Sequence, residues 1–375
     1  MVGVAYLLAH LFFLLFVDLP WMPPPPPSNP DPASAKKKNP DGPLIFRDDF
    51  LSDTKSGGNK IVVFASSDGN FGGTIKGIEQ SKLGKIKIPE TFLKTFKKAA
   101  KSIQTQTNGF VLFSVINGAY LNLTLNWLCN VYALEKNPKE QIHNAVLIVS
   151  LDESACKKIV KDWKGVTCLW LKGADQRYNR DAEENLIIYK IIAHVRINLI
   201  AALAESKVPF VMFESDSVWL KNPTQRLFAN SDLIDDADLM LPLNSRNEKG
   251  HRYGFNTVLA FTKNGTRRAA QEMRRIMNRN LDIPDQEVIN RLCSSQYMGL
   301  VCREFPYDLL TDGKWFKMSE AERKATKSTP YIVNNNFYSG GRNKVARQTI
   351  NGLWFLSAKG ICNSSKARKI IAKYV

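Results

Sequence analysis

The stretch VPFVMFESDSVWLKNP, residues 208–223, joins an apolar run to a pair of carboxylates. The run from 208 to 213 is almost entirely apolar, which predicts a buried strand. Glu214 and Asp216 follow at once, one residue apart. Carboxylates at positions i and i+2 of a strand point to the same side. At a strand end such a pair is able to hold one hard divalent cation, although an isolated pair is more often a solvated strand end.

The chain around this stretch alternates between predicted strands and predicted helices. Apolar runs predict strands at 110–116, 145–151, 167–171 and 208–213. Helical spacing predicts helices at 120–134 and 153–163 and a long amphipathic helix at 185–205. This order predicts an α/β fold in which a mostly parallel sheet is covered by helices on both faces. Ligands of such sheets collect at the carboxyl ends of the strands, an edge that here carries Asn117, Asp152, Glu214 and Asp216.

The N-terminal part of the chain predicts a membrane segment and a stem. Residues 3–17 are apolar except for His10, so residues 1–22 read as an uncleaved signal-anchor or a cleaved signal peptide. No Lys or Arg precedes this run, and Lys36–Lys38 follow it. The positive-inside rule alone would therefore place the C-terminal side in the cytoplasm, which counts against a type II anchor. Residues 23–43 form a Pro-rich stem. Residues 44–107 are an extension with one possible strand at 60–64, and residues 108–375 form the α/β domain.

The charge of the chain argues against nucleic acid as its partner. The chain has 375 residues, 44% of them hydrophobic, and a net charge of +17. However, its Lys and Arg are spread over most of the length, and no zinc-finger, RRM-like or basic-zipper pattern accompanies them. The charge therefore predicts a preference for acidic ligands such as nucleotide diphosphates, acidic glycans or anionic membrane surfaces. No nucleophile-elbow or phosphate-loop sequence supports a hydrolase or a P-loop site.

The cysteines and the glycosylation sequons fit a lumenal chain. The six cysteines include no CxxC and have no His at ligand spacing, so we expect either disulfides, with Cys156/Cys168 and Cys293/Cys302 as local pairs, or buried free thiols. Acceptor sequons begin at Asn122, Asn264 and Asn363. Asn122 is the weakest candidate because it falls in a predicted helix.

An ordered set of motifs resembles one known family. Residues 208–223 are similar to the DxD segment of the nucleotide-diphospho-sugar transferases of GT-A fold, the group that contains the plant rhamnogalacturonan xylosyltransferases of glycosyltransferase family 77. Further segments match in the same order along residues 108–356: FSVINGAYLNLTLNW (113–127), IVSLD (148–152), YGFNT (253–257), DQEVIN (285–290) and VNNNFYSGGRNKVARQTINGLW (333–354).

The resemblance implies a role for each matching residue. It implies that Asp216, with Glu214 and the residue at position 334, Asn334, holds a metal ion, Mn²⁺ or Mg²⁺. It implies that six residues contact the nucleotide sugar: Asn117, Asp152, Glu214, Asp216, Asn256 and Lys344. Lys344 matches the lysine that contacts the diphosphate, and its cationic head suits that role. Asp285 and Gln286 match residues beside the sugar and the acceptor and are the candidate catalytic residues. Lys190 matches a lysine at the same edge, but is equally well explained as a solvated helix lysine.

Three positions depart from the family pattern. Glu214 stands where the family usually has Asp, and its longer side chain shifts the geometry of the carboxylate pair. Asn334 stands where the family has a metal-binding His, and a neutral amide is a weaker ligand for Mn²⁺ than imidazole. Val258 replaces an expected Gly and crowds the sugar pocket. We expect these changes to leave the fold intact and to bear on activity.

Three functional hypotheses follow. The first is a metal-dependent, retaining glycosyltransferase, xylosyl- or galactosyltransferase-like, that moves a sugar from a UDP-sugar to a glycan or glycoprotein. It would be a single-pass Golgi membrane protein with a lumenal catalytic domain, or alternatively secreted or in the lumen of the endoplasmic reticulum. The second is a catalytically inactive GT-A-fold binding or partner protein in the secretory pathway. The third is a cytosolic basic nucleotide-binding protein, which requires an N-terminus without a targeting role.

Overall fold

The computed structural model describes residues 88–374, with gaps at 108, 136–140, 173–180, 182–185, 230–231, 233–234, 248–249, 262, 281, 327 and 337–339. All described residues belong to one unit of the chain, Ile61–Val375. The predicted signal-anchor, the stem and the possible strand at 60–64 lie outside the described residues.

Four parallel strands form the part of the sheet that the sequence predicts. They are β1 (Val111–Ile116), β2 (Val146–Ser150), β3 (Thr167–Trp170) and β4 (Phe210–Phe213). Their order in the sheet is β3-β2-β1-β4, with every neighbouring pair parallel. The chain thus runs outward from β1 to β3 and then returns to the other side of β1. The predicted mostly parallel α/β sheet is confirmed for this half of the sheet.

The rest of the sheet is mixed. Beside β4 lies the antiparallel β8 (Thr257–Ala260), followed by β6 (Leu239–Asn247), which pairs with both β7 (Gly250–Tyr253) and β9 (Cys302–Phe305). A small separate sheet consists of β10 (Leu310–Thr311), β11 (Ile332–Val333) and β5 (Val218–Trp219). None of the strands β5 to β11 was predicted from the sequence. Most of them are too short for an alternation of apolar and polar residues to be recognised.

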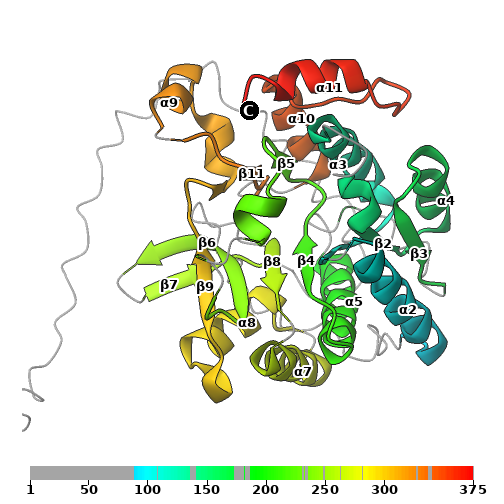
Figure 1. Ribbon diagram of the computed structural model, residues 1–375, viewed down its shortest axis with the longest axis vertical. Helices are drawn as coiled ribbons and strands as arrows, with labels where there is room; N and C mark the ends of the chain where they lie inside the picture. Colours follow the sequence, from blue (N-terminus) through cyan, green and yellow to red (C-terminus); the bar gives the residue numbers. More distant parts are fainter. Residues whose placement is uncertain are drawn as a thin grey trace, which may run out of the picture. The chain divides into compact units, whose positions relative to one another are not determined.

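Helices lie on both sides of the sheet (Figure 1), and successive side chains of a strand point to opposite sides. In β1, Phe113 packs in a core with one set of helices, whereas Leu112 packs in a core with the other set. The first set is α2 (Glu90–Thr107), α5 (Leu186–Glu205), α7 (Asn264–Arg279) and α8 (Asp285–Ser294). The second set is α3 (Leu121–Leu134), α4 (Glu153–Asp162) and α11 (Ser364–Ile371), together with the small sheet. Both faces of the sheet are therefore covered, as predicted.

Two helices differ from their sequence-based description. The extension at 44–107, left without assignment except for one strand, contains α2, whose Phe96, Ala100 and Ile103 are buried in the core. The prediction that 185–205 is amphipathic is wrong, because α5 lies between the sheet and α2, α7 and α8 and is apolar on nearly all sides. Among the described residues, Ile187–Glu205 is also the one segment long and apolar enough to cross a bilayer, but 72% of it is buried as a core helix.

Three disulfides join all six cysteines. Cys156–Cys168 and Cys293–Cys302 are the two local pairs that the sequence predicts, so the alternative of buried free thiols does not hold. The third, Cys129–Cys362, ties α3 to the segment that precedes α11 across a sequence separation of 233 residues. The C-terminal segment is thereby fixed against the helix that follows β1.

We expect the third disulfide to contribute most to stability. In the chain-entropy model the stabilisation rises with loop length, from about 3 kcal/mol for a 15-residue loop to about 4.7 kcal/mol for a 100-residue loop. Replacing Cys129 and Cys362 by Ser is therefore expected to cost about 4–5 kcal/mol in guanidinium unfolding. The matched change of Cys293 and Cys302, which closes a separation of 9 residues, is expected to cost about 2–3 kcal/mol. Equal losses, or the reverse order, would contradict this expectation.

Candidate functional site

The candidate site lies at the carboxyl edge of the parallel strands. Between β1 and β4 the strand order reverses, and in open α/β sheets ligands bind at such a switch point. Asn117 follows β1, Leu151 and Asp152 follow β2, and Glu214 follows β4. The four strand-end residues predicted from the sequence, Asn117, Asp152, Glu214 and Asp216, thus lie at one edge of the sheet.

The Asp216 carboxylate is buried and is paired with a lysine from a distant part of the chain. The ammonium of Lys344, in α10 (Gly341–Ile350), donates to Asp216 Oδ2, and the two side chains are only 4% and 5% exposed. Gln348, one helical turn further, donates from Nε2 to the backbone carbonyl of Asp216 at 2.7 Å. Positions i and i+4 of a helix lie on the same face, so α10 holds the Asp216 residue at two points.

Helix α10 is itself fixed by contacts that do not involve the ammonium. Gln348 Oε1 accepts from Asn126 Nδ2 in α3 at 3.0 Å, and the Lys344 carbonyl accepts from Asn335 Nδ2 at 3.1 Å. The helix follows Gly340, whose φ of 93° is one that residues with a side chain rarely adopt. The Gly341 N–H donates to the carboxylate of Asp181, which also accepts from the Tyr120 hydroxyl. Lys344 is therefore presented to Asp216 by a rigid frame.

Glu214, the first acid of the pair, is bound to an arginine that sequence reasoning missed. Arg196 in α5 donates from one terminal nitrogen to Glu214 Oε1 at 3.0 Å and from the other and from Nε to Asp285 Oδ2. The Asp285 side chain is fully buried and also accepts from the Tyr189 hydroxyl at 3.3 Å. The sequence did contain a sign of this contact, namely an arginine in a long apolar helix. A charged residue in such a helix is seldom buried without a partner, so Arg196 indicated a buried ion pair.

The electrostatics of this group follow from its burial. Burial raises the pKa of Glu214 to about 7, repulsion by Asp216 adds to the rise, and Arg196 and Lys344 oppose it. Burial lowers the pKa of Arg196, but attraction by Asp285 and Glu214 outweighs it and the pKa is raised overall. The Asp285 charge, with burial, raises the pKa of Tyr189 above its ordinary value. Arg196 thus remains a cation and Tyr189 a neutral donor at physiological pH.

The asparagines around position 334 form an amide network beside the carboxylates. Asn334 Nδ2 donates to Asn256 Oδ1 at 3.2 Å, and Asn334 Oδ1 accepts from the Thr257 hydroxyl at 3.3 Å. The carbonyl of Asn256 accepts from the Glu214 N–H at 3.0 Å, which links this network to the end of β4. Asn335 is 1% exposed, and its Oδ1 has no hydrogen-bond partner in the described part of the chain.

The other predicted residues have local structural roles at the same edge. Asn117 is buried and accepts from the Tyr120 N–H, and Asp152 caps α4 by accepting from the Ala155 N–H at 2.7 Å. Lys190, explained equally well as a solvated lysine, is 10% exposed and pairs with Asp282. The predicted contacts of Asn117 and Asp152 with a nucleoside stay predictions.

Asp285 and Gln286, the candidate catalytic residues, open helix α8. Asp285 is directed at Arg196, and its Oδ1 also accepts from the Gln286 N–H at 2.8 Å. Gln286 is partly exposed. These contacts show how Asp285 orients Arg196 towards Glu214, whereas the roles of both residues beside a sugar stay predictions.

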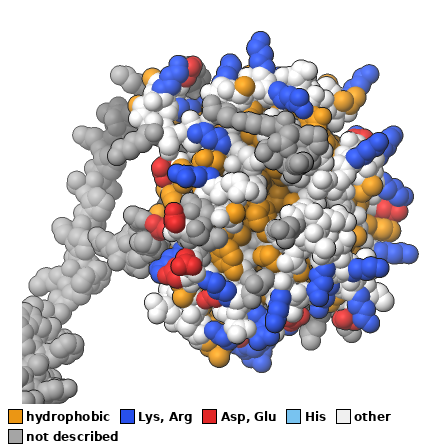
Figure 2. Space-filling view, viewed as in Figure 1, with side chains coloured by type: hydrophobic (Ala, Val, Ile, Leu, Met, Phe, Trp, Pro, Cys, Tyr) orange, Lys and Arg blue, Asp and Glu red, His pale blue; other side chains and the backbone are white. Residues whose placement is uncertain are grey.

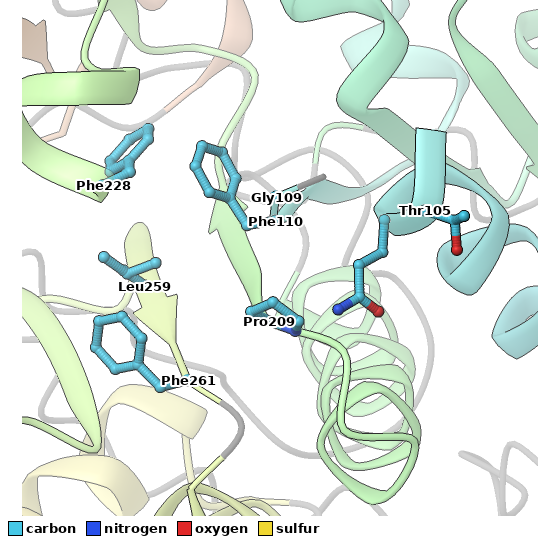
Figure 3. Close-up of a pocket in the computed structure, with 8 residues that line it drawn as sticks. Thr105, Gly109, Phe110, Pro209, Phe228, Leu259 and Phe261 are labelled. Carbon is cyan, nitrogen blue, oxygen red and sulfur yellow. The ribbon is translucent and has the colours of Figure 1, made fainter. Parts of the chain in front are cut away.

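A cavity of about 650 Å³ lies at the opposite edge of the sheet (Figure 3). Phe110 and Pro209 precede β1 and β4, and Phe228, Leu259 and Phe261 face them across the cavity. Hydrophobic side chains are visible in a hollow of the molecular face in Figure 2, whereas Lys and Arg are scattered over that face. None of the predicted site residues lines the cavity. The cavity is therefore separate from the carboxylate cluster.

A family model described as nucleotide-diphospho-sugar transferase matches residues 141–348, more than half of the chain. No curated protein matches the sequence. Among solved structures, the glycosyltransferase GlyE of Streptococcus pneumoniae TIGR4 in its apo form is 13% identical, with a TM-score of 0.40 over 70% of this chain and 64% of GlyE. This chain thus spans less than two thirds of the length of GlyE.

Two further solved structures show a similarity of the same order. The galactosyltransferase LgtC, in complex with donor and acceptor sugar analogs, is 11% identical with a TM-score of 0.41, over 70% of this chain and 96% of LgtC. Mouse xyloside xylosyltransferase 1 in its apo form is 8% identical with a TM-score of 0.38, over 63% of this chain and 98% of the mouse protein.

We expect Arg196 to be essential for the stability of the site. Arg196→Ala leaves the buried Asp285 without a cation, a change that typically costs about 3–5 kcal/mol. Arg275→Ala is the control, because Arg275 pairs with Glu272 at the surface with 47% of its side chain exposed and such pairs contribute at most about 1 kcal/mol.

Urea unfolding of the two variants measures the difference. Replacing Arg196 by Met together with Asp285 by Asn is expected to recover part of the loss, since no uncompensated charge then remains at that position. If Arg196→Ala were no more destabilising than Arg275→Ala, the central place of Arg196 would be contradicted.

Proposed function

The chain belongs to the nucleotide-diphospho-sugar transferases, and on that premise we propose that it transfers a sugar from a UDP-sugar to a glycan or glycoprotein acceptor. The observation that carries the proposal is the buried Asp216–Lys344 pair, with the partly exposed Glu214 beside it, at the switch point of the sheet. It combines carboxylates with a cation at the edge where α/β proteins bind nucleotides.

The chain supplies binding and orientation at this edge. The backbone of Lys344 is held by the hydrogen bond from Asn335, and its ammonium lies at Asp216. This ammonium is placed to bind a diphosphate that enters beside Asp216. Such a cation stabilises the negative charge that gathers on the diphosphate when the bond to the sugar breaks. Arg196, held by Asp285, fixes the carboxylate of Glu214 at the end of β4. Arg196 and Glu214 are therefore in position before a substrate binds, which lowers the reorganisation that the reaction needs at this point.

The oxygen atoms of the site suit a hard divalent cation. Among the described residues no group of three or more His, Cys, Asp or Glu side chains is placed to hold a metal ion. Two carboxylates, those of Glu214 and Asp216, are present at this edge, and the amide oxygen of Asn335 is buried without a partner in the described residues. The Lys344 ammonium on Asp216 marks a place where positive charge is favoured. Mg²⁺ and Mn²⁺ prefer such oxygen ligands, and when bound they neutralise charge on a diphosphate leaving group. We therefore keep metal dependence in the proposal, with Asp216 and Glu214 as ligands and Asn334 and Asn335 as the amides beside them.

We further propose that the transfer retains the anomeric configuration. Inversion uses a general base at the acceptor, for which a carboxylate is one of several suitable side chains. In the described cluster Asp216 is paired with Lys344, and Glu214 and Asp285 are both paired with Arg196. This pairing supports retention. The identity of the sugar, xylose, galactose or another, is a matter for experiment.

The proposed location is the lumen of the secretory pathway, with Golgi membrane anchoring through residues 1–22. All six cysteines are in disulfides, and structural disulfides persist in oxidising compartments rather than in the cytosol. This supports a lumenal, or a secreted, catalytic domain over the cytosolic alternative.

The proposal is tested by calorimetric titration of the full-length protein with UDP in Mn²⁺ or Mg²⁺, followed by assays of hydrolysis of a panel of UDP-sugars. We expect UDP to bind, and Asp216→Asn to weaken that binding at least tenfold, about 1.4 kcal/mol. Asp282→Asn is the control, because Asp282 is 44% exposed and pairs with Lys190 near the same edge. It is expected to bind UDP as the wild type does.

The outcomes separate the competing hypotheses. If UDP binds with neither metal ion, the proposed function is wrong. If UDP binds and no UDP-sugar is hydrolysed or transferred, the chain is instead a catalytically inactive GT-A-fold binding protein, an alternative that the departures at Glu214 and Asn334 favour.

A further inference from the structure

Among the described residues, the site contains two groups of ion pairs. Glu214 and Asp285 share Arg196, and Asp216 pairs with Lys344. Resting on the proposed function, we propose that Lys344 is an exchangeable counter-ion. In the empty enzyme it occupies Asp216 and excludes a divalent cation, and it leaves Asp216 only when the diphosphate of the donor takes over the ammonium.

Burial makes the Asp216 charge dependent on a cation at all times. The carboxylate is 5% exposed on its side chain, and a buried carboxylate without a partner costs several kcal/mol. Lys344 meets this need in the empty enzyme. A divalent cation that approached the same carboxylate would face the Lys344 ammonium at close range, and like charges at such a distance repel strongly in a poorly solvated site. The two cations therefore exclude one another at Asp216.

Lys344 is able to leave without any movement of the backbone around it. The contacts of Gln348 with Asp216 and Asn126, and the contact of Asn335 with the Lys344 carbonyl, hold α10 independently of the ammonium. The four-carbon stem of lysine has several freely rotating bonds. The ring of Tyr120, whose centroid is 6.0 Å from Lys344 Nζ, offers the ammonium a second favourable neighbour. The exchange thus needs rotation of the Lys344 side chain but no displacement of α10.

The donor changes the charge balance in favour of a metal ion. A UDP-sugar brings two further negative charges, on its diphosphate, to this edge of the sheet. When Lys344 turns to the diphosphate, the Asp216 carboxylate becomes available as an oxygen ligand. Asn334 in place of the family's His weakens the site for a metal ion alone. Both features predict that the metal ion binds with the nucleotide and not before it.

The test is a titration of the full-length protein with Mn²⁺, in which electron paramagnetic resonance measures the free Mn²⁺. With UDP present, we expect the wild type to bind Mn²⁺ at least tenfold more tightly than without UDP. Lys344→Gln removes the competing charge while keeping an amide that is able to donate to Asp216. We expect this variant to bind Mn²⁺ without UDP at least tenfold more tightly than the wild type does.

Arg342→Gln provides the matched control. Arg342 is exposed on the same helix, and its replacement removes one positive charge outside the Asp216 contact. We expect this variant to bind Mn²⁺ without UDP as weakly as the wild type does. An equal gain in both variants would reduce the effect to overall charge and overturn the proposal.

Two other results would also overturn it. One is wild-type Mn²⁺ binding that is equally tight with and without UDP, which needs no variant and stands even if Lys344→Gln does not fold. The other is UDP binding in excess chelator that is as tight as in Mn²⁺, because the metal ion would then never take the place of Lys344. Failure of the proposed function is distinct, since it is the absence of UDP binding under every condition.

Discussion

A buried carboxylate at the end of a strand has to be matched by a cation, and at Asp216 that cation is Lys344. The two residues are 128 positions apart, so the pair forms only when α10 has returned to the edge of the sheet. Gln348 and Asn126 support this return through contacts with Asp216 and α3. The position of α10 is therefore coupled to the buried charge that follows β4.

A cation also holds the other acid of the pair. Glu214 is partly exposed, yet its contact with Arg196 in α5 connects it to Asp285 and hence to α8. Helices α5 and α8 on one side, and α10 with its contact to α3 on the other, thus each bring charged side chains to the carboxyl edge. In the family to which the chain belongs, this is the place where a nucleotide diphosphate is expected. The departures at Glu214 and Asn334 change the ligands but keep oxygen atoms at the site.

The sequence predicted those parts of the fold that are local and periodic. Strands β1 to β4 and helices α3, α4 and α5 are each found within about two residues of their predicted bounds, because apolar runs and helical spacing are visible in one short segment. The partners of the site were different. Arg196 and Gln348 are single polar residues in helices whose importance depends on contacts 89 and 132 positions away. Resemblance to a family located Lys344, whereas its pairing with Asp216 depended on three-dimensional packing.

Hydrogen exchange measured by mass spectrometry, with and without UDP and Mn²⁺, tests the central claim that the donor binds at the carboxyl edge. The account predicts slower exchange in the peptides that contain Glu214 to Ser217 and the first turn of α10, because both meet the nucleotide. It predicts no change around Phe110 and Phe261, which line the cavity at the opposite edge. Protection confined to that cavity would contradict the account.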